Sequence, residues 1–201
     1  MESRAARSDE VDAVTGTIAR AFAHDPIWEP ALRRSDGETA HHAPYWRLFV
    51  EGALRYGTLR TTPGGEAVAV WLPPGGVELT DAGTAALEAL VAKALDDAGR
   101  DALHELFDRF EASRASHPEH YYLSLLATHP DHRGLGIGQR LLAADLAAWD
   151  AAGSPSYLES TNPANDHRYE RAGFRPVGGF RAVRDDAWVT AMWRPVGGAT
   201  S

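Results

Sequence analysis

The sequence predicts a single α/β domain of the α+β kind, with helices flanking a mixed central sheet of about six to seven strands. Apolar residues recur at helical spacing in several segments, and short apolar runs of strand length lie between them. No internal repeat or low-complexity linker divides the 201 residues, a length that suffices for one domain with its own core.

The N-terminal half combines helices with one predicted hairpin. Val11, Val14 and Ile18 repeat at helical spacing, and the helix ends before Pro26, because the residue preceding a proline is pushed out of the helical region. The pattern predicts helices over 11–22, 44–56 and 82–114, the last with a break at Gly99, and strands over 58–62 and 67–72.

The C-terminal half contains the apolar runs expected of central strands. The segments 121–128 and 157–160 are continuous and apolar, as in strands buried on both faces. We predict helices over 137–150 and 163–172, a closing hairpin over 174–183 and 188–194, and a frayed tail over 195–201.

Composition and net charge limit the kinds of molecule that the protein is expected to bind and the compartment in which it is expected to work. The formal net charge of −8 disfavours nucleic acid and anionic membranes, and no apolar run approaches the ~20 residues that span a bilayer. The absence of cysteine excludes a disulfide framework, a thiol nucleophile and a cysteine metal site. The charged start, Met1–Arg4, does not resemble a signal peptide. We therefore expect a cytoplasmic protein with neither nucleic acid nor membrane as partner.

The most informative segment is the glycine-rich stretch Arg133-Gly134-Leu135-Gly136-Ile137-Gly138. It follows a predicted strand and opens a predicted helix. Glycines let the backbone approach a ligand closely, and the first N–H groups of a helix have no internal partner. Together with the positive end of the helix dipole, they form a site for an anion such as a phosphate.

Two common phosphate loops fit this stretch poorly. A P-loop requires Lys and Ser or Thr after the last glycine, where this chain has Gln139 and Arg140. For a dinucleotide fingerprint, the spacing of Gly134 and Gly136 is right, and Glu159 follows roughly 20 residues later. However, Gln139 replaces the third glycine, residues 129–133 lengthen the turn, and only about 40 residues remain after Glu159 to complete such a fold.

Two blocks together resemble the GNAT superfamily of acyl-CoA N-acyltransferases. Arg133-x-x-Gly136-x-Gly138 matches its loop signature, and the block from Asn165 through Tyr169 to Gly173-Phe174 resembles its Asn-x-x-x-Tyr-x-x-x-Gly-Phe pattern. The resemblance covers residues 120–181 and is strongest toward puromycin N-acetyltransferase and its relatives. It implies a splayed sheet and one domain over 1–201, divided into an acceptor-side half (1–119), an acetyl-CoA-binding core (120–181), a closing strand (182–194) and the tail (195–201).

The resemblance implies acetyl-CoA as the co-substrate. Its pyrophosphate would lie on the N–H groups of the glycine-rich loop, and its pantetheine arm would pair with the strand before the loop. Asn165 would contact the arm, although Asn also caps helices. The implied cofactor-binding residues are Leu126, Ala127, Thr128, Arg133, Gly134, Leu135, Gly136, Ile137, Gly138, Gln139, Asn165 and Tyr169.

The same resemblance makes Tyr169 the candidate general acid and Glu159 the candidate general base. A phenol with a pKa of about 10 stays protonated at neutral pH and can donate to a departing thiolate. Glu159 ends the strand that faces the acetyl group, where it can take a proton from the attacking amine, although a surface or salt-bridged carboxylate is an equal alternative. The candidate acceptor-binding residues are Asp25, Trp28, Glu29, Tyr45 and Trp46, which combine carboxylates with aromatic rings.

The expected activity is transfer of acetyl to a primary amine of a small molecule, with antibiotics among the candidate acceptors. Two alternatives stay open: acetylation of a protein lysine or N-terminus, and a non-catalytic CoA-binding module. The histidines show no spacing typical of a metal site, so we expect no metal. A monomer and a homodimer are both compatible with the sequence.

Overall fold

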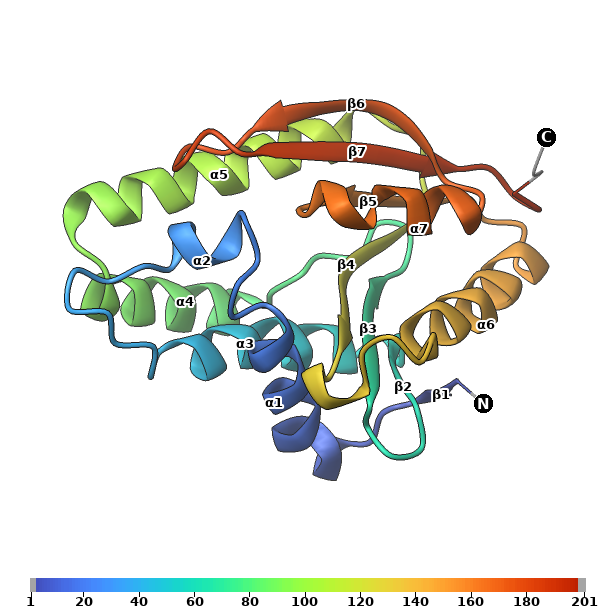
Figure 1. Ribbon diagram of the computed structural model, residues 1–201, viewed down its shortest axis with the longest axis horizontal. Helices are drawn as coiled ribbons and strands as arrows, with labels where there is room; N and C mark the ends of the chain where they lie inside the picture. Colours follow the sequence, from blue (N-terminus) through green and yellow to red (C-terminus); the bar gives the residue numbers. More distant parts are fainter. Residues whose placement is uncertain (1–2, 199–201) are drawn as a thin grey trace.

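The computed structural model describes residues 3–198 and contains a seven-stranded open sheet with helices on both faces (Figure 1). The strand order is β1-β2-β3-β4-β5-β7-β6, and β4 and β5 form the parallel pair. The strands are β1 (Arg4–Ala5), β2 (Leu59–Thr61), β3 (Ala67–Leu72), β4 (Tyr121–Thr128), β5 (Ser156–Ser160), β6 (Arg175–Arg181) and β7 (Trp188–Arg194). The α-helices are α1 (Val11–Ala21), α2 (Trp28–Ala31), α3 (His42–Leu54), α4 (Asp81–Ala94), α5 (Asp97–Ala115), α6 (Ile137–Ala151) and α7 (Asp166–Arg171). Short 3-10 turns lie at Ser8–Glu10, Pro130–His132 and Pro163–Asn165.

Strand β3 is buried on both faces of the sheet, which explains its continuous apolar sequence. Its side chains alternate, so Val68 and Val70 belong to the core beneath α1 and α3, and Ala69 and Trp71 to the core beneath α6. Figure 1 shows α6 on one side of β3 and β4, and α1 and α3 on the other. The central strands are therefore held rigidly from both sides.

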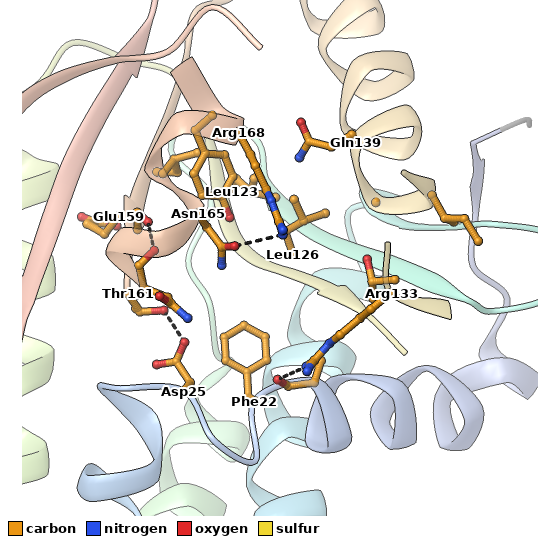
Figure 2. A pocket seen from close by; sticks show the side chains of 18 of the residues that line it. Phe22, Asp25, Leu123, Leu126, Arg133, Gln139, Glu159, Thr161, Asn165 and Arg168 are labelled. Atoms are coloured by element: carbon orange, nitrogen blue, oxygen red, sulfur yellow. Dashed lines mark hydrogen bonds between the residues drawn. The ribbon is translucent and has the colours of Figure 1, made fainter. Parts of the chain in front are cut away.

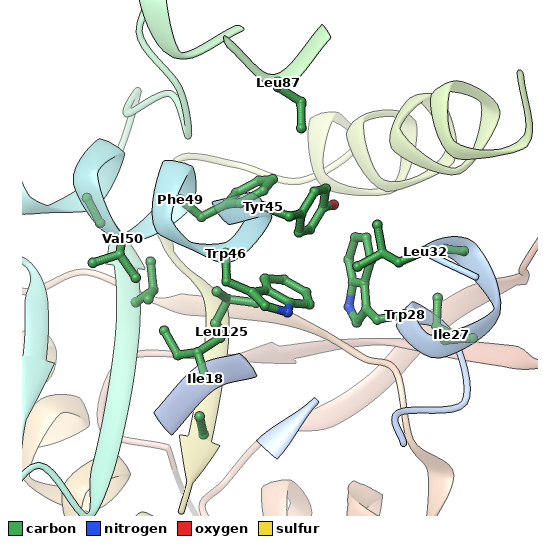
Figure 3. Close-up of a cluster of buried hydrophobic side chains, with 14 of the residues drawn as sticks. Ile18, Ile27, Trp28, Leu32, Tyr45, Trp46, Phe49, Val50, Leu87 and Leu125 are labelled. Carbon is green, nitrogen blue, oxygen red and sulfur yellow. The ribbon is translucent and has the colours of Figure 1, made fainter. Parts of the chain in front are cut away.

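The core beneath α1 and α3 is rich in aromatic rings (Figure 3). Trp28 of α2 meets Trp46 of α3 edge to face, with ring centroids 5.3 Å apart. Trp28 also lies nearly parallel to Phe110 of α5, at 5.6 Å. Because such rings bury large areas and prefer these geometries, they fix α2, α3 and α5 relative to one another.

The predicted break at Gly99 is wrong by a few residues. The chain leaves the helix at Leu95, and α5 begins at Asp97. Asp96 is the N-cap, since its side chain accepts a 2.8 Å hydrogen bond from the N–H of Gly99. The helix boundary is thus set by a capping carboxylate, and Gly99 lies inside the first turn of α5.

Candidate active site

Strands β4 and β5 separate halfway along their length. They pair in parallel only as far as Leu123 opposite Leu158, whereas β4 pairs with β3 on its other edge as far as Thr128. The register on that edge shifts at Ser124, which is a β-bulge. Beyond the bulge, the described sheet pairing gives β4 no partner on the β5 side, and a gap opens as the resemblance implied.

A cavity of about 550 Å³ occupies this gap (Figure 2). The predicted cofactor-binding residues that line it are Leu126, Thr128, Arg133, Gly134, Gly136, Ile137, Gly138, Gln139, Asn165 and Tyr169. The side chains of the other two point elsewhere: Ala127 is buried in the core, and Leu135 is 59% exposed. Only the backbone of Ala127 and Leu135 is therefore suited to serve the cavity.

The glycine-rich loop bends sharply before α6. Gly134 and Gly136 have φ values of +81° and +69°, a region that favours glycine. Gly136 is the N-cap of α6, and within the described part of the chain no side chain caps this helix and no acidic residue lies in its first turn. The first N–H groups of α6 thus stay available to an anion.

Gly138 allows α6 to lie close to β4. A Cβ atom at this position would come within 2.5 Å of the hydroxyl oxygen of Thr128. A side chain here would require the Thr128 hydroxyl or the helix to shift. Packing against β4 therefore favours glycine at this position, independently of any ligand.

Three arginines line the cavity: Arg133, Arg168 and Arg171. Arg133 donates to the carbonyl oxygen of Ala21 at 2.9 Å, which ties the glycine-rich loop to the end of α1. Sequence reasoning missed Arg168 and Arg171, although their i, i+3 spacing places both on one face of α7. Together the three side chains add positive charge to the cavity wall, which favours an anionic ligand.

Asn165 is the N-cap residue of α7, and Tyr169 lies within this helix. The Asn165 side chain makes no capping hydrogen bond and instead accepts from Arg168 at 3.1 Å. The ring of Tyr169 packs against Phe174, with centroids 6.2 Å apart. Burial is the main reason that the pKa of Tyr169 is raised, so its hydroxyl stays protonated at neutral pH.

Glu159 is a buried carboxyl group without a hydrogen-bond partner among the described residues. Burial raises its pKa to about 8, because the charged form loses its hydration. The hydroxyls of Tyr157 and Tyr122 lie close enough to lower this pKa in part, but not in standard hydrogen-bond geometry. A carboxyl group that titrates near neutral pH at a cavity wall is suited to accept or donate a proton.

The predicted acceptor residues of the α1–α2 region occupy different environments. Asp25 lines the cavity, but its carboxylate already accepts from the N–H groups of Ile27 and Trp28 and from the hydroxyl of Thr161. Trp28 lines the same cavity. Glu29 lines neither of the two cavities described here and lies 3.9 Å from the guanidinium of Arg33.

The other two predicted acceptor residues lie in the aromatic core. Tyr45 is only 1% exposed, whereas Trp46 lines a second, smaller cavity. Glu78 and Ser124 also line that cavity, and sequence reasoning singled out neither. The hydroxyl of Ser124 donates to Glu78 at 2.5 Å. The hydroxyl of Ser124 inside an otherwise apolar strand was the one available signal.

Residues 3–198 contain no group of three His, Asp or Glu side chains arranged to hold a metal ion. His129 and His132 approach each other, with ring centroids 5.8 Å apart. In the same range, no helix combines the length and the apolar character needed to cross a bilayer.

The family described as "Acetyltransferase (GNAT) domain" matches residues 83–176. The structure also resembles that of a protein described as histone acetyltransferase HPA2 and related acetyltransferase from Corynebacterium glutamicum. The two chains are 26% identical over 99% of this chain and 97% of the other, with a TM-score of 0.67.

Two enzymes from insects share the fold at lower identity. Arylalkylamine N-acetyltransferase 2 from Aedes aegypti is 13% identical over 97% of this chain and 98% of its own, with a TM-score of 0.67. The polyamine N-acetyltransferase of Drosophila melanogaster, which forms N-acetylagmatine, is 16% identical over 96% and 99%, with a TM-score of 0.65. With the split sheet and the glycine-rich loop, the family match and the 26% identical acetyltransferase support an acyltransferase whose residues 83–176 are similar to the GNAT acetyltransferase domain.

Proposed function

We propose that the protein transfers the acetyl group of acetyl-CoA directly to a primary amine of a small molecule. One observation carries the proposal: a single cavity has the uncapped start of α6 and the unpartnered carboxyl group of Glu159 in its walls. The first is suited to bind a phosphate, and the second to remove a proton.

The cavity has the features that a coenzyme A donor requires. The N–H groups at the start of α6 and the guanidinium groups of Arg168 and Arg171 suit the pyrophosphate. Leu126 and Thr128 lie on the part of β4 that has lost its strand neighbour, so their backbone groups suit the amides of the pantetheine arm. The thioester would then lie near the bulge at Ser124.

The residues at that end of the cavity suit acetyl transfer. The ammonium group first gives one proton to the Glu159 carboxylate; the amine nitrogen then bonds to the thioester carbonyl carbon, the carbon–sulfur bond breaks, and the second proton that the nitrogen loses replaces the one that Tyr169 gives to the sulfur. Tyr169 donates a hydrogen bond to the departing sulfur and is the source of the proton that the sulfur gains. Because its raised pKa disfavours the phenolate, the hydrogen bond rather than complete early proton transfer stabilises the transition state.

A small-molecule acceptor is favoured by the aromatic rings that enclose the smaller cavity beside Glu159. The names of the insect enzymes of the same fold agree with such an acceptor. The resemblance to puromycin N-acetyltransferase adds antibiotics bearing a free amine as candidates. A protein lysine would require a groove open along its length.

The test is release of free thiol from acetyl-CoA by the purified protein, measured with a thiol reagent across a panel of amines. The panel includes alkylamines, phenethylamine, agmatine, puromycin and a lysine-containing peptide. We expect thiol release with at least one small amine. Tight CoA binding without thiol release for any amine would favour a non-catalytic CoA-binding module.

A further inference from the structure

A second cavity adjoins the first behind Glu159. Its volume is about 30 Å³, and Trp28, Ser124, Glu159 and Thr161 line both cavities. We call it the aromatic recess, because most of its remaining wall consists of the rings of Trp46, Phe49, Phe107, Phe110 and Tyr122. Figure 3 shows three of its rings, those of Trp28, Trp46 and Phe49.

The polar side of the recess is formed by Glu78. The hydroxyl of Ser124 donates to this carboxylate at 2.5 Å, and the guanidinium of Arg114 lies 4.0 Å from it. Arg114 also lies over the ring of Tyr122, 4.7 Å from its centroid. The Glu78 side chain keeps 25% of its surface exposed, so a ligand has access to it.

The recess carries a net negative charge whenever Glu159 is ionised. Two carboxyl groups, Glu78 and Glu159, then face one cation, Arg114, and the buried Glu159 oxygens have no partner in standard hydrogen-bond geometry among the described residues. A buried carboxylate is costly unless a donor or a cation compensates it. An ammonium group supplies one positive charge and three donors, and the faces of the surrounding rings also attract cations.

Resting on the function proposed above, we propose that the aromatic recess receives the acceptor as a small cationic primary amine, and that Glu78 is the residue that selects for its charge. The ammonium group enters between Glu78 and Glu159, and the hydrocarbon part packs against the rings. The recess has room for about two water molecules. It therefore fits an ammonium group with a short alkyl segment, whereas an acceptor of the size of puromycin would require the rings to move.

The two carboxyl groups have different roles, one in binding the acceptor and one in accepting its proton. Burial raises the pKa of Glu78, but the hydroxyl of Ser124 and the guanidinium of Arg114 oppose this shift and stabilise the carboxylate that would attract the cation. Glu159 has no partner in standard hydrogen-bond geometry, and burial raises its pKa to about 8, so its carboxylate is the group that accepts the proton once the ammonium has entered. Glu78 thus governs binding of the acceptor, and Glu159 its activation.

The test compares Glu78→Gln with the wild type, using propylamine as the acceptor and 1-propanol as a neutral competitor at pH 7. We expect the KM for the amine to rise by about tenfold or more, with the KM for acetyl-CoA and the inhibition constant of the alcohol unchanged. Glu88→Gln is the matched control, because it removes the same charge from α4, outside both cavities.

An unchanged KM for the amine, or an equal loss of affinity for the alcohol, would overturn the selection by Glu78. Calorimetric titration of propylamine separates this result from failure of the proposed function. If the wild type binds the amine without releasing thiol, and Glu78→Gln does not bind the amine, the result supports amine binding in the recess and contradicts the proposed acetyl transfer. If neither protein releases thiol or binds any small amine, the result contradicts both the acetyl transfer and the amine site in the recess.

Folding of the variant is checked by circular dichroism. If Glu78→Gln does not fold, Glu78→Asp decides the question, because it keeps the charge and shortens the side chain. We expect an amine KM above that of the wild type for Glu78→Asp, with the preference for the amine over the alcohol retained. Loss of that preference in a folded Glu78→Asp protein would contradict the role of the charge.

Discussion

The hydroxyl of Thr161 donates a 2.7 Å hydrogen bond to the carboxylate of Asp25 (Figure 2). This bond joins the segment after α1 to the segment after β5, at the wall of the larger cavity. Asp25 also accepts from the N–H groups of Ile27 and Trp28 at the start of α2. One carboxylate therefore both closes the loop over the cavity and holds Trp28, which lines both cavities.

Replacing Asp25 by Ala should destabilise the fold and weaken acceptor binding. The change leaves three donors without their partner, which we expect to lower the free energy of unfolding by about 2 kcal/mol. Loss of the anchor for Trp28 should also raise the KM for the amine. Urea unfolding and steady-state kinetics measure the two effects. Thr161→Ser keeps the hydroxyl and is the control; equal stability of Asp25→Ala and wild type would show that the bonds contribute nothing.

Gly136→Asp tests the anion site at the start of α6. Asp and Asn both tolerate the positive φ of this position and both cap helices well, and the nearest atom to a new Cβ is the flexible end of Arg140, at 3.2 Å. The fold should therefore survive both changes. The added charge of Asp should weaken CoA binding about tenfold or more relative to Gly136→Asn, as measured by calorimetry. Equal affinities would place the pyrophosphate elsewhere.

The local signals of the sequence predicted β4 and the start of α6 at the residues where the structure has them. An uninterrupted apolar run and a glycine-rich turn act on neighbouring residues, so they can be read from the chain. The interaction of Glu78 with Ser124 joins residues 46 positions apart, and the polar Ser124 in an apolar run does not indicate which residue it pairs with. The bulge at Ser124 likewise depends on how β3 and β4 pair. The strand and the glycine-rich turn that line the larger cavity were therefore predictable, while the polar wall of the aromatic recess was not.

Tyr169→Phe should lower kcat by about 100-fold and leave the KM for acetyl-CoA nearly unchanged. The substitution removes only the hydroxyl, and the ring keeps its contact with Phe174. Tyr121→Phe is the control, since Tyr121 stacks on Trp149 and lines neither of the two cavities described here. A wild-type kcat for Tyr169→Phe would assign the proton on sulfur to another source.

The rate should depend on pH through Glu159. Only the carboxylate form accepts a proton, and its pKa is about 8. We therefore expect kcat/KM of the wild type to rise as the pH increases from 6 to 9, with an inflection near that pKa. Removing the hydroxyl of Tyr157, which lowers the pKa of Glu159, should move the inflection to higher pH in Tyr157→Phe. An inflection that does not move would mean that another group controls the rate.

The same pKa predicts how the stability of Glu159→Gln differs from that of the wild type. The pKa of Glu159 is about 8 in the folded protein, against an ordinary value of 4.5. Between these values the folded state holds a proton that the unfolded state has lost, so the free energy of unfolding falls as the pH rises. Glu159→Gln has no carboxyl group at this position, so it lacks this pH-dependent fall in the free energy of unfolding. Its stability relative to the wild type should therefore increase by a few kcal/mol from pH 5 to pH 8. Glu78 titrates in both proteins, so its contribution largely cancels. Urea unfolding at the two pH values measures the difference, and a difference independent of pH would contradict the protonation of buried Glu159.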